Sequence, residues 1–227
     1  MIDAAIRAVY FDAVGTLLFP RQAVGATYAD FAARHGIAVD ESCFSVAFRE
    51  AFMRQELLDS RNNWRTDETR ERTRWRAIVA ELIPGAGSTQ CFDELWNWYG
   101  RPQAWRVNPE SAEVFIELTR RGLVVGMASN FDSRLNVLVG AIPDLAQLRE
   151  RCVVSSLIGW RKPAREFYMA VAQNAGCSPA QVLYVGDDLR NDIHGATSAG
   201  LKAILFDPDD RADVGPRIRS LRDLLTA

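Results

Sequence analysis

The sequence has no long apolar run and almost no net charge. No stretch approaches the ~20 apolar residues that a membrane-spanning helix needs. The start, Met1-Ile2-Asp3, has neither the basic segment nor the apolar segment of a signal peptide. The formal net charge of -2 gives no overall attraction to nucleic acid or to an anionic membrane. These absences favour a cytoplasmic enzyme that acts on a small molecule, with neither nucleic acid nor membrane as a partner.

Cysteine and lysine are also scarce. The four cysteines are scattered without a CxxC pair, which argues against a zinc site and against a disulfide framework. Nearly all positive charge comes from arginine, and only Lys162 and Lys202 are lysines. Lys202 is expected on the surface. Lys162 precedes Pro163 at the start of a predicted helix, where a point charge can neutralise an anion.

Short apolar runs and helical stretches alternate along most of the chain. The runs span 8–11, 124–128, 153–155, 182–185 and 203–206. Their composition predicts strands buried on both faces, as in a parallel sheet. Helices with clear start and stop residues are predicted over 109–122, 163–176 and 191–200. This alternation is typical of a doubly wound α/β fold.

The segment from about Pro20 to Trp105 contains no convincing strand. It predicts helices over 23–35, over 41–59 with Asp40 as cap, over 67–83 with Thr66 as cap, and over 92–99. Because this insertion follows the first strand, it is expected over the edge of the sheet where ligands of open α/β sheets bind. We therefore predict an α/β core domain (1–19 and 106–227) and a helical lid (20–105).

Four polar patches follow successive strands and are expected to meet at that edge. They are Asp12-Ala13-Val14-Gly15-Thr16, Ser129-Asn130, Lys162-Pro163 and Asp187-Asp188-Leu189-Arg190-Asn191-Asp192. A carboxylate that emerges from a buried strand, here Asp12, can act as a nucleophile. Three carboxylates in one tight turn favour a bound cation, and Asp187 and Asp192 are the expected ligands. Asp188 either points outward or binds Lys162.

The order Asp, Ser, Lys, Asp-Asp resembles the haloacid dehalogenase superfamily of hydrolases. The resemblance spans nearly the whole chain, and the helical insertion resembles the first-position cap of that superfamily on its Rossmann-like core. The stretch 11–17, followed by 28–36, looks most like the dehalogenase-like hydrolase branch. The resemblance implies a two-step transfer through an aspartyl intermediate. In it, Asp12 is the nucleophile, Ser129 holds a phosphoryl oxygen, and Lys162 fixes Asp12 and offsets its charge.

The resemblance also implies a magnesium ion. Mg²⁺ would bridge Asp12, the backbone carbonyl of Val14, the substrate phosphoryl group and Asp187. Asp192 would bind it directly or through water. In the family's phosphatases, position 14 is a second aspartate that protonates the leaving oxygen and then activates water. Valine cannot carry a proton, and general acid–base assistance is typically worth ~10² to 10⁴ in rate.

Further residues are expected to contact an anionic substrate. Thr16 and Asn130 belong to the patches above, and Arg21 lies directly behind the first of them, although anchoring the lid is an alternative role for Arg21. The segment 61–76 of the lid is rich in arginine and tryptophan. Ion pairs on a helix face explain this composition best, and an anionic or aromatic substrate is the alternative.

Three functions are compatible with a valine at position 14. The first, which we prefer, is a Mg²⁺-dependent phosphohydrolase of a small phosphorylated metabolite. It would act slowly, act on substrates with good leaving groups such as acyl or aryl phosphates, or use an acidic residue of the lid as the proton donor. The second is a metal-independent 2-haloacid dehalogenase, whose halide needs no proton but whose acidic cluster would lack a purpose. The third is a non-catalytic binding protein on the same fold.

Overall fold

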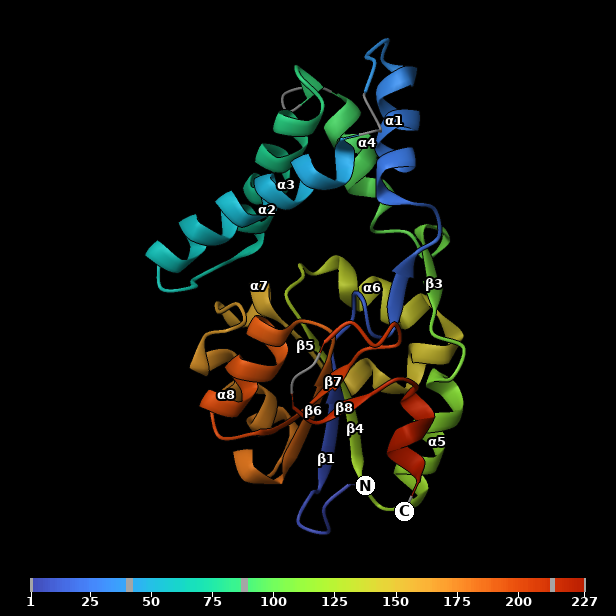
Figure 1. Cartoon of the computed structure of the whole chain (residues 1–227), viewed down its shortest axis with the longest axis vertical. Coiled ribbons are helices and arrows are strands. Elements are labelled where there is room, and N and C mark those ends of the chain that lie inside the picture. The colour runs from blue at the N-terminus through green and yellow to red at the C-terminus, as the bar shows by residue number, and fades with distance from the viewer. Residues whose placement is uncertain (1, 40–42, 87–89, 213–214, 227) are drawn as a thin grey trace.

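The computed structural model describes residues 2–39, 43–86, 90–212 and 215–226 and has a six-stranded sheet at its centre (Figure 1). The strands are β1 (Ala8–Phe11), β4 (Val124–Ser129), β5 (Cys152–Val154), β6 (Val182–Gly186), β7 (Lys202–Phe206) and β8 (Arg217–Ile218). Their order is β5-β4-β1-β6-β7-β8, and every neighbouring pair is parallel. This confirms the predicted doubly wound sheet.

The central strand β1 is buried on both faces because its side chains alternate between two apolar cores. Val9 and Phe11 pack in one core, where the Phe11 and Phe115 rings lie 5.3 Å apart. Ala8 and Tyr10 pack in the other core. Helix α5 (Ser111–Arg120) covers the first face, and helix α8 (Arg165–Ala175) covers the second (Figure 1). Both helices lie where the sequence predicted them.

The strand register brings the polar patches to one edge of the sheet. Phe11 of β1 is level with Met127 of β4 and with Val185 of β6. The residues that follow these three strands therefore emerge side by side. The order of strands also reverses around β1, which makes this edge the point where ligands of doubly wound sheets bind.

The remaining elements outside the sheet and the cap helices are short. They are α6 (Arg134–Ala141), α7 (Ser155–Ile158), α9 (Gly195–Ser198), the 3₁₀ turns Pro102–Ala104, Pro143–Arg151, Pro179–Gln181 and Leu221–Leu225, and the π-helical turn Leu189–His194. The helix predicted over 191–200 is therefore a π turn that continues as α9. The hydroxyl of Tyr168 donates to the carbonyl oxygen of Asn191, and this bond competes with regular α-helical bonding.

In its described residues, the inserted segment forms four helices above the sheet edge (Figure 1). These are α1 (Val24–Arg34), α2 (Phe44–Arg61), α3 (Glu68–Leu82) and α4 (Gln90–Trp98). The predicted cap of α3 is wrong, because Asp67 accepts from the Arg70 amide at 2.7 Å while the Thr66 hydroxyl donates to Glu71. The predicted cap Asp40 lies outside the described residues.

A two-stranded antiparallel ribbon joins the helical cap to the core domain. Strands β2 (Leu18–Pro20) and β3 (Trp105–Val107) are three residues each. The sequence did not predict them, because so short a strand carries no measurable periodicity. The domain limits at 20 and 105 fall inside this ribbon and stay a prediction. Among the helices of the described ranges, none has the length and apolar character needed to cross a membrane.

Candidate active site

Lys162 holds two carboxylates together beneath the sheet edge. Its Nζ atom lies 2.7 Å from Asp12 Oδ1 and 2.6 Å from Asp192 Oδ1. All three residues are buried, with exposed fractions of 3%, 6% and 0% for Lys162, Asp12 and Asp192. Burial alone would lower the pKa of Lys162, but Asp12 and Asp192 outweigh it and raise that pKa above its ordinary value. The lysine therefore stays charged and fixes both carboxylates.

Asp187 completes a cluster of three carboxylates. Oxygens of Asp12, Asp187 and Asp192 all lie within 4.8 Å of one another. Although Asp187 is exposed to the pocket, burial of its carboxyl group, then Asp12 and Asp192, raise its pKa to about 8. Burial also raises the pKa of Asp192 to about 7 against the opposing effect of Lys162, with a further contribution from Asp12. Three carboxylates thus face one ammonium group, and this excess of oxygen ligands and negative charge fits a divalent cation.

Two glycines let the backbone approach these carboxylates. Gly15 has φ +96°, and a Cβ atom there would lie 2.2 Å from Asp187 Oδ2. A Cβ atom on Gly186 would lie 2.2 Å from Asp192 Oδ2. Contacts this short are impossible for any other residue type without displacing the acids. The turn after β1 and the end of β6 are therefore shaped around the cluster.

The turn after β6 is built by Asp188. Its Oδ1 atom accepts from the amides of Arg190 and Asn191 at 2.8 and 2.9 Å, and its Oδ2 atom accepts from the Asn191 side chain at 3.1 Å. Asp188 is exposed, and the ion pairs found for Lys162 in the described structure involve Asp12 and Asp192. Of the two predicted alternatives for Asp188, the bond to Lys162 is wrong: the carboxylate binds the amides of its own turn, and Asp188 lines the pocket.

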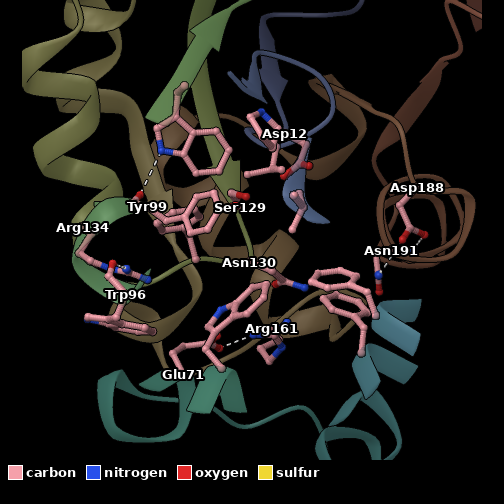
Figure 2. A pocket seen from close by; sticks show the side chains of 18 of the residues that line it. Asp12, Glu71, Trp96, Tyr99, Ser129, Asn130, Arg134, Arg161, Asp188 and Asn191 are labelled. Carbon is pink, nitrogen blue, oxygen red and sulfur yellow. Dashed lines mark hydrogen bonds and ion pairs between the residues drawn. The ribbon is translucent and has the colours of Figure 1, made fainter. Parts of the chain in front are cut away.

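Ser129 and Asn130 line the same pocket as Asp12 (Figure 2). Ser129 ends β4 and is buried. Asn130 binds the backbone of Lys162 on both sides: Oδ1 accepts from its amide at 2.7 Å, and Nδ2 donates to its carbonyl at 3.2 Å. Asn130 therefore positions the lysine, and its expected contact with substrate stays a prediction.

Thr16 and Arg21 lie away from the centre of the pocket. Thr16 is fully buried, and its hydroxyl oxygen lies 3.5 Å from Asp187 Oδ1. Arg21 donates to the carbonyl oxygens of Gln103 and Trp105 at 3.2 and 3.0 Å. These bonds tie Arg21 to the ribbon that enters the cap, which fits the anchoring alternative. Contacts of Thr16 and Arg21 with substrate stay predictions.

Asp12, Asp187 and Asp192 line a cavity of about 340 Å³, which is walled by residues of both core and cap (Figure 2). Val14 lines it and is 36% exposed. Aromatic rings make up much of the remaining wall: Tyr28, Phe48, Phe52, Trp75, Phe92, Trp96, Tyr99, Trp105 and Phe131. Of these rings, the sequence analysis considered only Trp75, within the segment 61–76, as an alternative contact for substrate, and it assigned the others to no site. Their clearest signal is the spacing of Phe44, Phe48 and Phe52, which places three rings on one face of a helix.

The cap is bound to the core through the residues that precede Lys162. Arg161 forms a buried ion pair with Glu71 of α3 (Figure 2), and its Nε atom lies 3.5 Å from Asp59 of α2. The Arg161 amide also donates to the carbonyl of Trp64 at 2.9 Å. Sequence reasoning missed Arg161, because only its buried contacts distinguish it from the other arginines.

The proteins that this chain resembles include both phosphatases and dehalogenases. The family model of haloacid dehalogenase-like hydrolases matches residues 6–200. Human haloacid dehalogenase-like hydrolase domain-containing protein 3 is 27% identical, with 88% of this chain and 81% of the relative covered. A ribulose-1,5-bisphosphate 5-phosphatase of Halopiger xanaduensis is 26% identical, with 91% and 87% covered. The solved L-2-haloacid dehalogenase of Xanthobacter autotrophicus is 20% identical, with 96% of each chain covered and a TM-score of 0.69, and therefore shares the fold.

Proposed function

The chain belongs to the haloacid dehalogenase-like hydrolase family, and on that premise we propose that it is a Mg²⁺-dependent phosphohydrolase of a small phosphorylated metabolite. One observation supports this choice within the family. Asp12, Asp187 and Asp192 carry more negative charge than Lys162 neutralises, and burial, together with the neighbouring carboxylates, raises the pKa of both Asp187 and Asp192. A cation resolves that conflict, whereas displacement of a halide by Asp12 has no need of one.

Asp12 and Asp187 are the residues that would hold the ion. The backbone carbonyl of Val14 would be a further ligand, and Asp192 would bind directly or through water, because its two oxygens already accept from Lys162 and from the Asp188 amide. When bound, the ion neutralises charge on the phosphoryl oxygens. Carboxylate and carbonyl oxygens are the ligands that Mg²⁺ prefers.

The side chains of the protein account for the transfer itself. Lys162 binds Asp12 Oδ1, which leaves Oδ2 to attack phosphorus while the bond from phosphorus to the ester oxygen breaks. The hydroxyl group of Ser129 donates a hydrogen bond to a phosphoryl oxygen. Water then attacks the phosphorus of the aspartyl phosphate, the bond to Asp12 breaks, and phosphate leaves. The proton that the water loses passes to solvent, because Val14 cannot accept it. Thr16 and Asn130 act through their neighbours, Asp187 and Lys162.

A 2-haloacid dehalogenase is the second candidate. Val14 favours it, because a halide leaves without a proton, and the apolar cavity suits a substrate with few polar groups. The carboxylates of Asp187 and Asp192 would then repel Asp12 with no compensating role. A binding protein without turnover is the third candidate, in which Asp12 never becomes phosphorylated.

We also propose that the protein acts in the cytoplasm. Cys91, Cys152 and Cys177 form no disulfide in the part of the chain that the structure describes. Free cysteines are typical of a reducing compartment. This is the support for the location, and no nucleic acid or membrane partner is proposed.

A screen of phosphate esters and 2-haloacids, with and without Mg²⁺, separates the three functions. We expect phosphate release that needs Mg²⁺, together with an acid-trapped phosphoenzyme, and loss of both in Asp12→Asn. Chloride release without Mg²⁺ would identify a dehalogenase instead. A folded protein that releases neither product and forms no phosphoenzyme would identify a binding protein.

A further inference from the structure

The cap side of the cavity is a continuous aromatic wall. Phe48 and Phe52 of α2 and Trp75 of α3 all line it. The ring centroids of Phe48 and Phe52 lie 6.3 Å apart, and Trp75 lies 6.4 Å from each of them. Trp96 and Tyr99 continue the wall toward the core domain (Figure 2). Whatever extends from the carboxylate cluster into this space meets rings.

The arginines of the cavity wall are already neutralised. Arg134 donates to Asp132 through two bonds of 2.7 Å, and its guanidinium group lies 3.4 Å above the centre of the Trp96 ring. Arg161 is paired with Glu71. Among the described wall residues, Lys162 is the remaining cation, and it already holds Asp12 and Asp192. A second anionic group on the substrate would therefore be buried without a partner, which is strongly unfavourable.

The valine at position 14 restricts the leaving group independently. Position 14 offers no acid, and Glu71, the lid carboxylate that lines the cavity, is paired with Arg161. The ester oxygen therefore departs with its electron pair and takes a proton from solvent afterwards. A phenol ionises near pH ~10, as tyrosine does. Water, which an aliphatic alcohol resembles in acidity, ionises near ~15.7. A phenolate therefore leaves far more readily than an alkoxide when no proton is supplied.

From these observations we infer that the substrate is a phosphate monoester of an aromatic alcohol that carries no second anionic group. The inference rests on the proposed function and specifies its substrate class. Asp12 attacks phosphorus, the bond between phosphorus and the phenolic oxygen breaks, and the phenolate stays against the aromatic wall until solvent protonates it. The aromatic wall binds the aromatic ring of the substrate. The same ring makes the ester oxygen a good leaving group, which is needed because Val14 supplies no proton.

Phosphonates test the inference without turnover, because their carbon–phosphorus bond is not cleaved by this route. Calorimetry with the full chain in Mg²⁺ compares methylphosphonate, naphthylmethylphosphonate and phosphonoacetate. Burial of the naphthyl group predicts about 10- to 100-fold tighter binding than methylphosphonate. Phosphonoacetate, with its second anionic group, is expected to bind no tighter than methylphosphonate.

Two variants test whether the aromatic wall causes the tighter binding of naphthylmethylphosphonate. Trp75→Leu is expected to weaken naphthylmethylphosphonate about 10-fold while leaving methylphosphonate unchanged. Trp98→Leu is the matched control, because Trp98 packs on Phe31 in the cap and does not line the cavity; it should change neither affinity.

The outcomes separate the inference from the proposed function. Equal binding of methyl and naphthyl compounds, or tightest binding of phosphonoacetate, would overturn the aromatic substrate class and leave a phosphohydrolase in place. Failure of all three phosphonates to bind in Mg²⁺ would overturn both. A naphthyl preference that Trp75→Leu removes and Trp98→Leu keeps would support both.

Discussion

The ammonium group of Lys162 lies 2.7 Å from the carboxylate of Asp12, and both side chains are almost completely shielded from solvent. This pair joins the polar patch that follows β5, which contains Lys162, to the patch that follows β1, which contains Asp12. Because Lys162 also binds Asp192 of the fourth patch, one lysine sets the spacing of the nucleophile and the expected metal ligand. The same lysine is one of only two in the chain.

Replacing Lys162 by methionine should destabilise the protein and abolish turnover. The substitution leaves Asp12 and Asp192 buried without a cation, and breaking a buried ion pair costs about 3–5 kcal/mol. Urea unfolding measures the loss. Lys202→Met is the matched control, because Lys202 is exposed, and it should stay within about 0.5 kcal/mol of the parent. Equal stability of the two variants would contradict the role given to Lys162.

The metal-free protein should lose stability as the pH rises from about 4 to about 8. The pKa of Asp187 rises on folding from 3.8 to about 8. Within that window the folded state keeps a proton that the unfolded state releases, so each rise in pH disfavours folding. Mg²⁺ needs the ionised carboxylates, and its stabilising effect should grow over the same window. Urea unfolding at pH 6 and pH 8, with and without Mg²⁺, measures both trends.

Asp187→Asn tests whether Asp187 is the source of that behaviour. The variant should show a smaller loss of stability between pH 6 and pH 8 and little stabilisation by Mg²⁺. Asp188→Asn is the control, since Asp188 caps its own turn. It should cost about 1 kcal/mol yet keep the response to Mg²⁺. If Asp188→Asn loses that response and Asp187→Asn keeps it, the ligands are assigned wrongly.

The sheet and the meeting of the four patches could be predicted because their signals are local. Each central strand is an apolar run bounded by polar residues, and parallel strands bring their carboxyl ends to one edge. Asp12, Lys162, Asp187 and Asp192 therefore converge as the sequence indicated. The distances that link them were not predictable, because they depend on side chains packed across the sheet.

The cap illustrates what local signals omit. Its helices were predicted, but the ring cluster of Phe48, Phe52 and Trp75 depends on how α2 and α3 cross. The arginine-rich segment forms ion pairs, but the preferred interpretation of pairs along one helix face is wrong, because the pairs found in the described structure join α3 to other helices: Arg70 and Arg74 bind Asp59, and Arg72 binds Asp93. Spacing along one helix could not identify those partners.

Gly15→Ala should reduce activity beyond the effect of backbone strain. A non-glycine residue at positive φ costs about 1–3 kcal/mol, and at Gly15 the added Cβ atom also collides with Asp187. Gly36→Ala is the control, because Gly36 has φ +71° with no atom within 4 Å of a Cβ atom. We expect similar strain in both variants and weaker Mg²⁺ binding only in Gly15→Ala. Normal Mg²⁺ binding by Gly15→Ala would mean that the close approach to Asp187 is not needed for the metal.

Val14→Asp should raise the hydrolysis of alkyl phosphates more than that of aryl phosphates. Val14 lines the cavity beside Asp12 and is 36% exposed, so an acid there has room and solvent access. General acid catalysis is typically worth ~10² to 10⁴, and an alkoxide needs the proton most. Comparing kcat/KM for methyl and phenyl phosphate measures the difference. Val14→Asn, which is polar but supplies no acidic proton, should raise neither rate. Equal gains for both esters would show that leaving-group protonation is not what the valine removes.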